Sequence, residues 1–349
     1  MTPLGEMLIA RIRTSGPITL ADYMAECLLH PKHGYYTTRD PFGTAGDFIT
    51  APEISQMFGE LLGLALAQSW LDQGSPAFTL AELGPGRGTL MADILRATRA
   101  VAGFHAAMTL CLIDASPTLQ ARQQSTLAAY PVQWLASTHD LPQAPLYLVA
   151  NEFFDALPIR QFQRDGDGWR ERLVTLADTG LGFALTAPAP VAALANRVAD
   201  IAQGQIVEYC PSAAAIMADI GDRIATHGGA ALIIDYGDWV SRGDTFQALK
   251  SNAFADPFAE PGAADLTAHV GFAALAKGPT AHAYTTQGAF LHRLGIAARS
   301  ERLARSLDGA ALQSHLAATR RLTHDQEMGT LFKVLALYPA TSPPPPGMT

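Results

Sequence analysis

A glycine-rich turn between two apolar segments limits the possible folds of this chain more than any other feature. Residues 80–90 read LAELGPGRGTL, with glycines at the alternate positions Gly84, Gly86 and Gly88. This pattern predicts a buried strand, a turn and the start of a helix. Glycine adopts backbone conformations that a Cβ forbids, and it lets the backbone approach a ligand closely. Because the start of a helix presents free N–H groups and a positive dipole end, doubly wound α/β folds bind nucleotide-like ligands at such turns.

The spacing within this turn indicates the kind of ligand. A dinucleotide fingerprint would need glycine at position 89, where this chain has Thr89. Glu82 lies two residues before the first glycine, and a carboxylate there suits a ligand with a cationic end more than a pyrophosphate. The spacing resembles motif I of class I S-adenosylmethionine-dependent methyltransferases. The alternative is a purely structural turn between a strand and a helix.

Short apolar segments around this turn alternate with helical patterns. Residues 78–83, 108–113, 132–135 and 146–150 have the composition of buried strands. Continuous apolar strands that alternate with helices are typical of a parallel sheet covered on both faces. With the methyltransferase-like turn, the pattern predicts an α/β, Rossmann-like fold with a mostly parallel seven-stranded sheet.

Changes in pattern along the chain predict its organisation. Residues 157–200 and 240–267 interrupt the alternation, and the first of these stretches contains a hairpin signal, DGDG, at 165–168. Four consecutive prolines follow the final predicted strand, and such a segment favours disorder. We therefore expect an N-terminal helical cap with a lid loop at 1–75, a methyltransferase core at 76–337 with insertions near 157–200 and 240–267, and a disordered tail at 338–349.

Composition excludes several classes of function. The net charge is −8 and no long run of Lys and Arg occurs, which argues against a nucleic-acid partner. No apolar segment reaches the roughly 18 residues of a membrane span. Cys27, Cys111 and Cys210 lack the spacing of a metal site or a disulfide framework, and the ten histidines show no ligand spacing. Residues 1–13 lack a signal-peptide pattern. We expect a cytoplasmic protein without metal, nucleic acid or integral membrane association.

Polar residues at two strand ends are candidates for contact with the cofactor. Asp114 ends the second predicted strand, where a carboxylate can accept both hydroxyls of an adenosine ribose. The alternative is a surface or helix-capping acid ahead of Pro117. Asn151 follows the fourth predicted strand directly. The loop at 43–53 contains Asp47 and Thr50 and has the composition of a lid over this edge of the sheet. Its alternative interpretation is a packed structural loop with Thr50 as a helix cap.

The acceptor of the transferred group should lie next to the fourth strand. Residues 151–155 read NEFFD, and the carboxyl end of this strand is the switch point where the reactive end of a ligand lies. Many class I methyltransferases hold the methyl-accepting nitrogen with a polar and aromatic motif there. Glu152 is therefore our first candidate for holding a cationic acceptor, and Glu208 and Asp235, at the ends of two later predicted strands, are the second. The alternative is that these acids only cap turns.

Five segments together resemble one family, and they are GDFITAPEISQMFGE (46–60), ELGPGRGTLMADILR (82–96), ANEFFDALPIRQF (150–162), LIIDYGD (232–238) and DLTAHVGF (265–272). They look like the MidA-type methyltransferases, the family of the mitochondrial complex I assembly factor that methylates an arginine. The resemblance runs from about residue 5 to about residue 337. It implies a class I core with an N-terminal helical cap and S-adenosylmethionine as the cofactor.

The resemblance also implies a reaction and assigns site residues. The family reaction is symmetric dimethylation of an arginine on the 49-kDa-type subunit of respiratory complex I, which makes that subunit the expected protein partner. The family glycine motif corresponds to Gly84, Gly86 and Gly88, and its acids to Glu82 and Asp114. The segment with Asp47 and Thr50 is expected near the cofactor. Because a mitochondrial member would carry a targeting presequence, we expect a bacterial cytoplasm.

Three other functions remain to be separated from this one. An NAD-dependent oxidoreductase would share the fold, but Thr89 and Glu82 count against it. A non-catalytic assembly chaperone could keep the cofactor site, and a methyltransferase could act on another acceptor, including a small molecule. For the arginine reaction we expect the Glu152 carboxylate to concentrate positive charge on one guanidinium nitrogen and to take up the proton.

Overall fold

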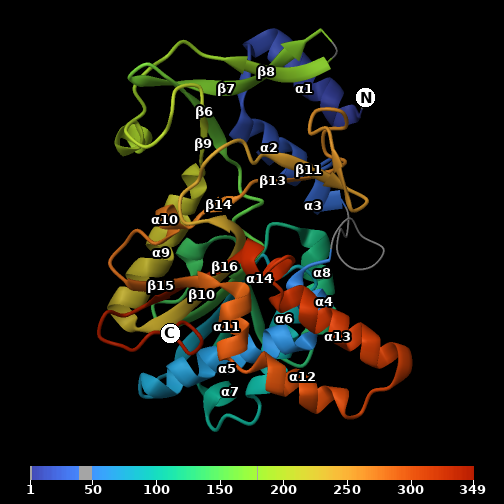
Figure 1. The fold of residues 1–349 in the computed structure, drawn as a ribbon, viewed down its shortest axis with the longest axis vertical. Coiled ribbons are helices and arrows are strands. Elements are labelled where there is room, and N and C mark those ends of the chain that lie inside the picture. Colours follow the sequence, from blue (N-terminus) through green and yellow to red (C-terminus); the bar gives the residue numbers. More distant parts are fainter. Residues whose placement is uncertain (1, 39–48, 179) are drawn as a thin grey trace.

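The computed structural model describes residues 2–38, 49–178 and 180–349 and shows two parts stacked on one another (Figure 1). The larger part, called the core here, contains a mostly parallel sheet with helices on both faces. The smaller part, called the cap, contains N-terminal helices and two antiparallel sheets. Most of the expected lid, including Asp47, lies outside the described residues.

The core sheet confirms the predicted fold class. Its order is β15-β16-β10-β5-β2-β3-β4, and the short β14 pairs with β10. The five neighbours from β10 to β4 are parallel, whereas β16 runs antiparallel to both β10 and β15. The strands are β2 (Phe78–Leu83), β3 (Met108–Ile113), β4 (Val132–Leu135), β5 (Leu146–Asn151), β10 (Gly229–Asp238), β14 (Val270–Gly271), β15 (Ala281–Thr286) and β16 (Phe332–Tyr338).

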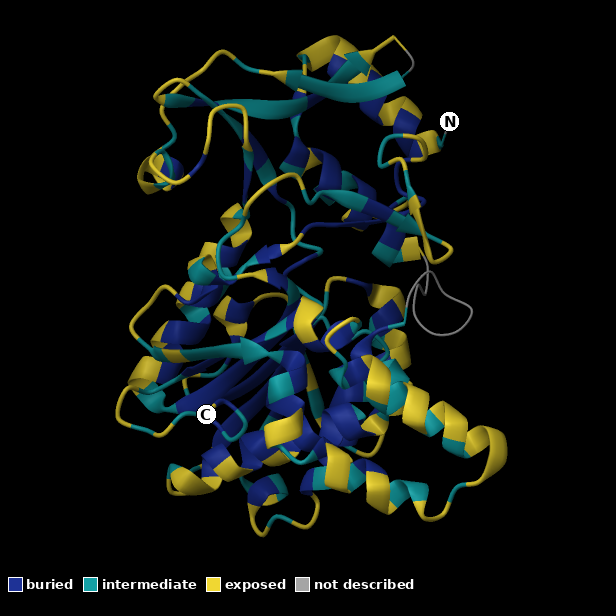
Figure 2. Ribbon diagram, in the orientation of Figure 1, coloured by how far each residue is buried: buried dark blue, intermediate teal, exposed yellow. Residues whose placement is uncertain are grey.

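Alternate residues of the core strands enter two separate hydrophobic clusters. Val149 of β5 packs on the side of helices α5 (Gln56–Asp72) and α6 (Thr89–Thr98). Its neighbour Leu148 packs on the side of α9 (Pro211–His227). A strand that is apolar at every position therefore follows from the two covered faces, because side chains alternate across a sheet. Figure 2 shows these strands as the most continuous buried region of the core.

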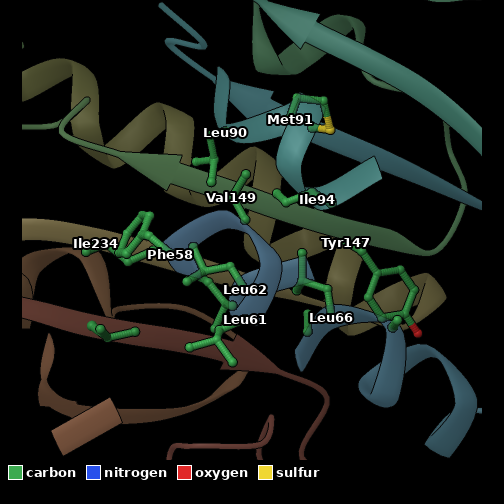
Figure 3. Close-up of a cluster of buried hydrophobic side chains, with 14 of the residues drawn as sticks. Phe58, Leu61, Leu62, Leu66, Leu90, Met91, Ile94, Tyr147, Val149 and Ile234 are labelled. Atoms are coloured by element: carbon green, nitrogen blue, oxygen red, sulfur yellow. The ribbon is translucent and has the colours of Figure 1, made fainter. Parts of the chain in front are cut away.

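Helix α5 belongs to the core, and this corrects the boundary expected at residue 75. The helix buries 12 of its 17 residues, so it is apolar on nearly all sides. Phe58 and Leu62 lie among core side chains such as Met91 (Figure 3). A Cβ at Gly59 would come within 2.6 Å of Asp93 Cβ in α6, so glycine permits the close crossing of the two helices. Among the residues up to 75 that the structure describes, only 2–38 contribute to the cap.

The cap combines segments that are far apart in the sequence. Leu8 of α1, Val174 of β7 and Leu266 of β13 share one hydrophobic cluster. Its larger sheet has the order β1-β7-β6-β9, with β8 on β7, and its smaller sheet has the order β12-β11-β13. Its elements are α1 (Pro3–Ser15), β1 (Ile18–Thr19), α2 (Leu20–Leu29), α3 (Tyr35–Thr38), β6 (Arg160–Asp165), β7 (Gly168–Ala177), β8 (Gly180–Leu185), η2 (Ala192–Arg197), β9 (Ile206–Tyr209), β11 (Gln247–Lys250), β12 (Ala253–Ala255) and β13 (Asp265–Thr267).

Strand β9 corrects a second expectation. The prediction that Glu208 lies beside the acceptor needs this strand in the core sheet, with its end at the same edge as β10. Instead Gln161 of β6 pairs with Glu208 of β9 in the antiparallel cap sheet. The strand is only four residues long, and its sequence does not distinguish pairing in one sheet from pairing in the other.

The C-terminal third adds helices that the sequence pattern did not predict. Helices α12 and α13 are largely exposed (Figure 2), and Arg299 of α12 forms an ion pair with Glu60 of α5 at 2.8 Å. The remaining helices are α4 (Ala51–Ile54), α7 (Phe104–Ala107), α8 (Pro117–Thr126), η1 (Thr138–Asp140), α10 (Phe272–Leu275), α11 (Gln287–Arg293), α12 (Ile296–Ala304), α13 (Gly309–Thr323) and α14 (Met328–Leu331). Within the described ranges, no helix combines the length and apolarity needed to cross a bilayer.

The expected disorder of the C-terminal tail is wrong. Met348 is buried and belongs to the same hydrophobic cluster as Phe290 of α11. Arg293 Nη1 donates to the carbonyl oxygen of Gly347 at 3.3 Å. The prolines lead the chain back to the core, and one apolar side chain after them anchors the end.

Candidate functional site

A cavity of about 590 Å³ lies at the carboxyl ends of the core strands, between the core and the cap. From the core, four of the sequence-predicted residues line it, and they are Gly84, Gly86, Asp114 and Glu152. Tyr36 and Asp265 line it from the cap. A smaller cavity of about 40 Å³ adjoins the glycine turn, and its lining includes Thr50, Glu82, Gly84, Gly86, Asn151 and Glu152.

The glycine turn needs its glycines for conformation and for space. Gly84, Gly86 and Gly88 have φ angles of +60°, +53° and +82°, in the left-handed region that favours glycine. A Cβ on Gly84 would come within 2.9 Å of the Phe153 ring, and Gly84 and Gly86 line both cavities. Gly88 lines neither cavity and instead forms the N-cap of α6. Gly88 therefore shapes the turn without lining either cavity.

Asp114 is held in place by a side chain that the sequence analysis missed. Gln123 Nε2 donates to Asp114 Oδ2 at 2.7 Å and to the carbonyl oxygen of Gly86 at 2.9 Å. Trp134 Nε1 in turn donates to Gln123 Oε1 at 3.0 Å. Burial raises the pKa of Asp114, while the bonds from Ser116 and Gln123 lower it. Gln123 thus joins the glycine turn to Asp114, and only its position on the buried side of α8 distinguishes it from neighbouring glutamines.

Gln123→Ala is expected to destabilise the protein by about 2 kcal/mol, because it leaves a buried carboxylate oxygen and a buried carbonyl without a donor. We also expect about tenfold weaker S-adenosylhomocysteine binding, because the turn and Asp114 lose their common support. Urea unfolding and calorimetric titration measure the two effects. Gln124→Ala, on the exposed side of the same helix, is the matched control. Equal behaviour of the two variants would contradict this role.

The small cavity presents two buried oxygens without partners. Glu82 Oε2 and Asn151 Oδ1 accept no hydrogen bond from any residue that the structure describes. Burial and the nearby Asp114 raise the pKa of Glu82 to about 8. An ammonium group would satisfy both oxygens and favour the ionised carboxylate. A ligand with an amino group at this end and an adenosine at Asp114 therefore fits the residues present, and S-adenosylmethionine has both groups.

Glu152 lies where the two cavities meet. Its backbone is left-handed, with φ +51°, which is uncommon for a residue other than glycine. Its Oε1 accepts the N–H of Ala51 at 3.2 Å and Asn151 Nδ2 at 3.0 Å. Burial, followed by the charge of Asp155, raises the pKa of Glu152 to about 7. A carboxylate held in this way can accept a proton near neutral pH.

Two further carboxylates line the large cavity beside Glu152. Asp155 is 6% exposed, its Oδ1 has no partner among the described residues, and burial raises its pKa to about 6 while Tyr236 lowers it. Asp265 Oδ1 accepts the hydroxyl of Tyr36 at 2.7 Å. Neither acid was among the site residues predicted from the sequence. The signal for Asp155 was present in the motif at 151–155, whereas Asp265 reaches the cavity only through the cap sheet.

Asp235 and Glu208 do not line this cavity, so its geometry does not support the prediction that they contact the acceptor. Asp235 is fully buried, and its Oδ2 accepts the N–H groups of Phe154 and Asp155 at 3.0 and 3.2 Å. It therefore fixes the loop that carries Glu152. Glu208 Oε1 accepts the N–H groups of Thr245 and Phe246, at 2.9 and 3.1 Å, inside the cap.

Four features together define an S-adenosylmethionine-dependent methyltransferase. They are the mostly parallel Rossmann-like sheet, the left-handed glycine turn, the acid after the second core strand and the cavity for a cationic ligand. The family model described as "Putative S-adenosyl-L-methionine-dependent methyltransferase" matches residues 61–290. The chain belongs to this family, and S-adenosylmethionine is its methyl donor.

Curated relatives and solved structures extend the similarity to nearly the whole chain. The chain is 39% identical to "Protein arginine methyltransferase NDUFAF7, mitochondrial" of Mus musculus, over 97% of this chain and 85% of the relative. The protein of the same name from Homo sapiens is 37% identical, over 97% and 84%. A Burkholderia thailandensis protein solved with S-adenosyl-homocysteine bound is 31% identical, with a TM-score of 0.81 over 99% of this chain and 92% of that one.

Proposed function

We propose that the chain methylates an arginine side chain of a protein and that carboxylates of the large cavity bind the guanidinium group. One observation carries this proposal. Glu152, Asp155 and Asp265 line the cavity that also contains the glycine turn, and no Lys or Arg among the described residues lines it. Such a cavity attracts a cation and repels an anionic acceptor. The names of the mitochondrial relatives support the same acceptor.

The side chains of the cavity supply what an arginine acceptor needs. Bound S-adenosylmethionine supplies a methyl group on a positively charged sulfur. A guanidinium group, with a pKa above about 12, is a poor nucleophile. Glu152 binds one guanidinium nitrogen, concentrates positive charge on it and so frees the lone pair of another. With its raised pKa of about 7, the Glu152 carboxylate also takes up the proton that the nitrogen loses.

Asp155 and Asp235 have separate supporting roles in this proposal. Asp155 is the second carboxylate of the cavity and holds the far side of the guanidinium group. Asp235 does not touch the acceptor, but its bonds to the N–H groups of Phe154 and Asp155 hold both acids in position. Holding the methyl donor and the acceptor nitrogen together in line contributes on the order of 7–11 kcal/mol to the transfer, and these bonds support part of that arrangement.

We further propose the 49-kDa-type subunit of complex I as the acceptor and symmetric dimethylation as the product. Incubation with methyl-labelled S-adenosylmethionine and this subunit from the same cell, followed by mass spectrometry, is expected to show two methyl groups on one arginine, one on each terminal nitrogen. The Gly86→Val variant is the negative control, and with it the subunit should receive no label. Tight cofactor binding without label on the subunit would exclude this acceptor and favour a non-catalytic role in assembly or another methyl acceptor.

A further inference from the structure

The opening of the large cavity has an unusual concentration of exposed apolar side chains. Among the described residues, eight large apolar side chains are exposed, and three of them line this one cavity. They are Phe254, Leu331 and Leu29, which are 78%, 47% and 42% exposed. Single exposed apolar residues are normal on a protein surface, but a group around one opening marks a binding surface.

These three side chains, called the apolar rim here, come from both parts of the molecule. Leu29 ends α2 and Phe254 lies in β12, both in the cap, whereas Leu331 ends α14 in the core (Figure 1). Behind them, Leu249 and Phe332 continue the apolar surface into the cavity. A ligand that enters between the cap and the core therefore meets apolar side chains on both walls.

The acids lie further inside the same cavity. Asp155 and Asp265 are nearly inaccessible, at 6% and 4% exposure, whereas the rim faces solvent. The lining thus changes from apolar at the opening to negatively charged at the inner end. A single arginine satisfies only the inner end, because its side chain has no group that would cover Phe254 and Leu331 as well. The rim needs additional apolar groups on the same ligand.

We propose that the apolar rim binds bulky apolar side chains next to the acceptor arginine, so that the substrate is an extended protein segment in which such residues flank the arginine. This inference rests on the proposed function, since it assumes that the arginine occupies the acidic end. Charge complementarity favours such a segment over a second copy of this chain, because the chain carries a net charge of −8.

Two fluorescein-labelled peptides test the rim directly. Each has a central arginine, with two leucines on each side in the first peptide and two serines in the second, so that their charges are equal. Fluorescence anisotropy with the full-length protein saturated with S-adenosylhomocysteine gives the two dissociation constants. We expect the leucine peptide to bind at least about tenfold more tightly, because each rim contact buries apolar area on both partners.

Variants of the apolar rim distinguish specific binding of the peptide from nonspecific hydrophobic binding. Phe254→Ser and Leu331→Ser are each expected to reduce the preference for the leucine peptide to about threefold or less, with binding of the serine peptide unchanged. Leu316→Ser is the matched control, because Leu316 is 46% exposed, like Leu331, but does not line the cavity. It should keep the full preference.

The outcomes separate this inference from the proposed function. Equal binding of the two peptides would contradict the proposal that the apolar rim binds the flanking side chains. A preference for the leucine peptide that persists in Phe254→Ser would contradict it as well. If a second copy of this chain covered the rim, the two peptides would also bind equally. The protein would then be a dimer in solution, and the Phe254→Ser variant would be a monomer. A clear preference in binding without methylation of any arginine, measured with labelled S-adenosylmethionine, would leave the rim intact and reject the proposed function.

Discussion

Glu152→Gln is expected to lower turnover about a hundredfold and to change S-adenosylhomocysteine affinity by less than about twofold. The amide keeps the size of the side chain and can still accept the N–H of Ala51, so the loop should retain its conformation. It cannot hold a negative charge or take up a proton, and loss of a general base typically costs at least 10²-fold in rate. Single-turnover methylation and calorimetric titration measure the two quantities separately.

Two comparisons make this result specific to Glu152. Glu301→Gln changes an exposed surface carboxylate and should leave turnover unchanged. Asp155→Asn removes the neighbouring acid and should weaken acceptor binding more than it slows the chemical step. Product formation by Glu152→Gln within about twofold of the wild-type rate would remove Glu152 from the proton transfer and direct attention to Asp155.

The pH dependence follows from the raised pKa of Glu152. Burial raises the pKa of this carboxyl group to about 7, so the group is mostly neutral below that pH and mostly ionised above it. Because the ionised form binds the guanidinium group and accepts the proton, kcat/KM should rise about tenfold per pH unit up to about pH 7 and then level off. The part of the rise between about pH 6 and 7 should be absent in Glu152→Gln, because only Asp155, with a pKa of about 6, then titrates beside the acceptor. Its persistence in that variant would assign the titration to another group.

Local patterns made the part of the cavity around the glycine turn predictable. The strand, the three glycines and the acid at the end of the next strand are adjacent in the sequence or follow from regular alternation of strands and helices. Gly84, Gly86 and Asp114 therefore lie where the pattern predicts, around one cavity. The same logic led to Glu152, because the fourth core strand neighbours the first in a sheet of this topology.

Non-local pairing made the acceptor half harder to predict. Glu208 ends a short apolar strand, as Asp114 does, but its partner strand is β6 of the cap, and pairing partners are not encoded in the composition of four residues. Asp235 does lie at the expected edge, yet its carboxylate points to backbone N–H groups and not to the cavity. Asp265 enters the site only because a late insertion packs on the N-terminal helices. Contacts of this length leave no periodic signal.

Gly86→Val is expected to weaken S-adenosylhomocysteine binding at least a hundredfold, the largest effect that we expect on the cofactor. Gly86 lines both cavities, so a branched side chain would fill space that the ligand needs. Its φ of +53° also lies in the left-handed region, where a β-branched residue is strained. Calorimetric titration measures the affinity, and urea unfolding measures the cost to the fold.

A matched glycine separates the loss of space from the backbone strain. Gly166, in the turn between β6 and β7, has a φ of +59°, and a Cβ there would have no atom within 4 Å. Gly166→Val should therefore lose about as much stability as Gly86→Val, on the order of 1–2 kcal/mol, and should bind S-adenosylhomocysteine with wild-type affinity. If the folded Gly86→Val variant bound S-adenosylhomocysteine with an affinity within about tenfold of the wild-type value, the glycine turn would not be the place where the ligand approaches the backbone. A loss of stability without a loss of affinity would then indicate that the turn is only a structural connection between strand and helix. This is the alternative that the sequence alone left open.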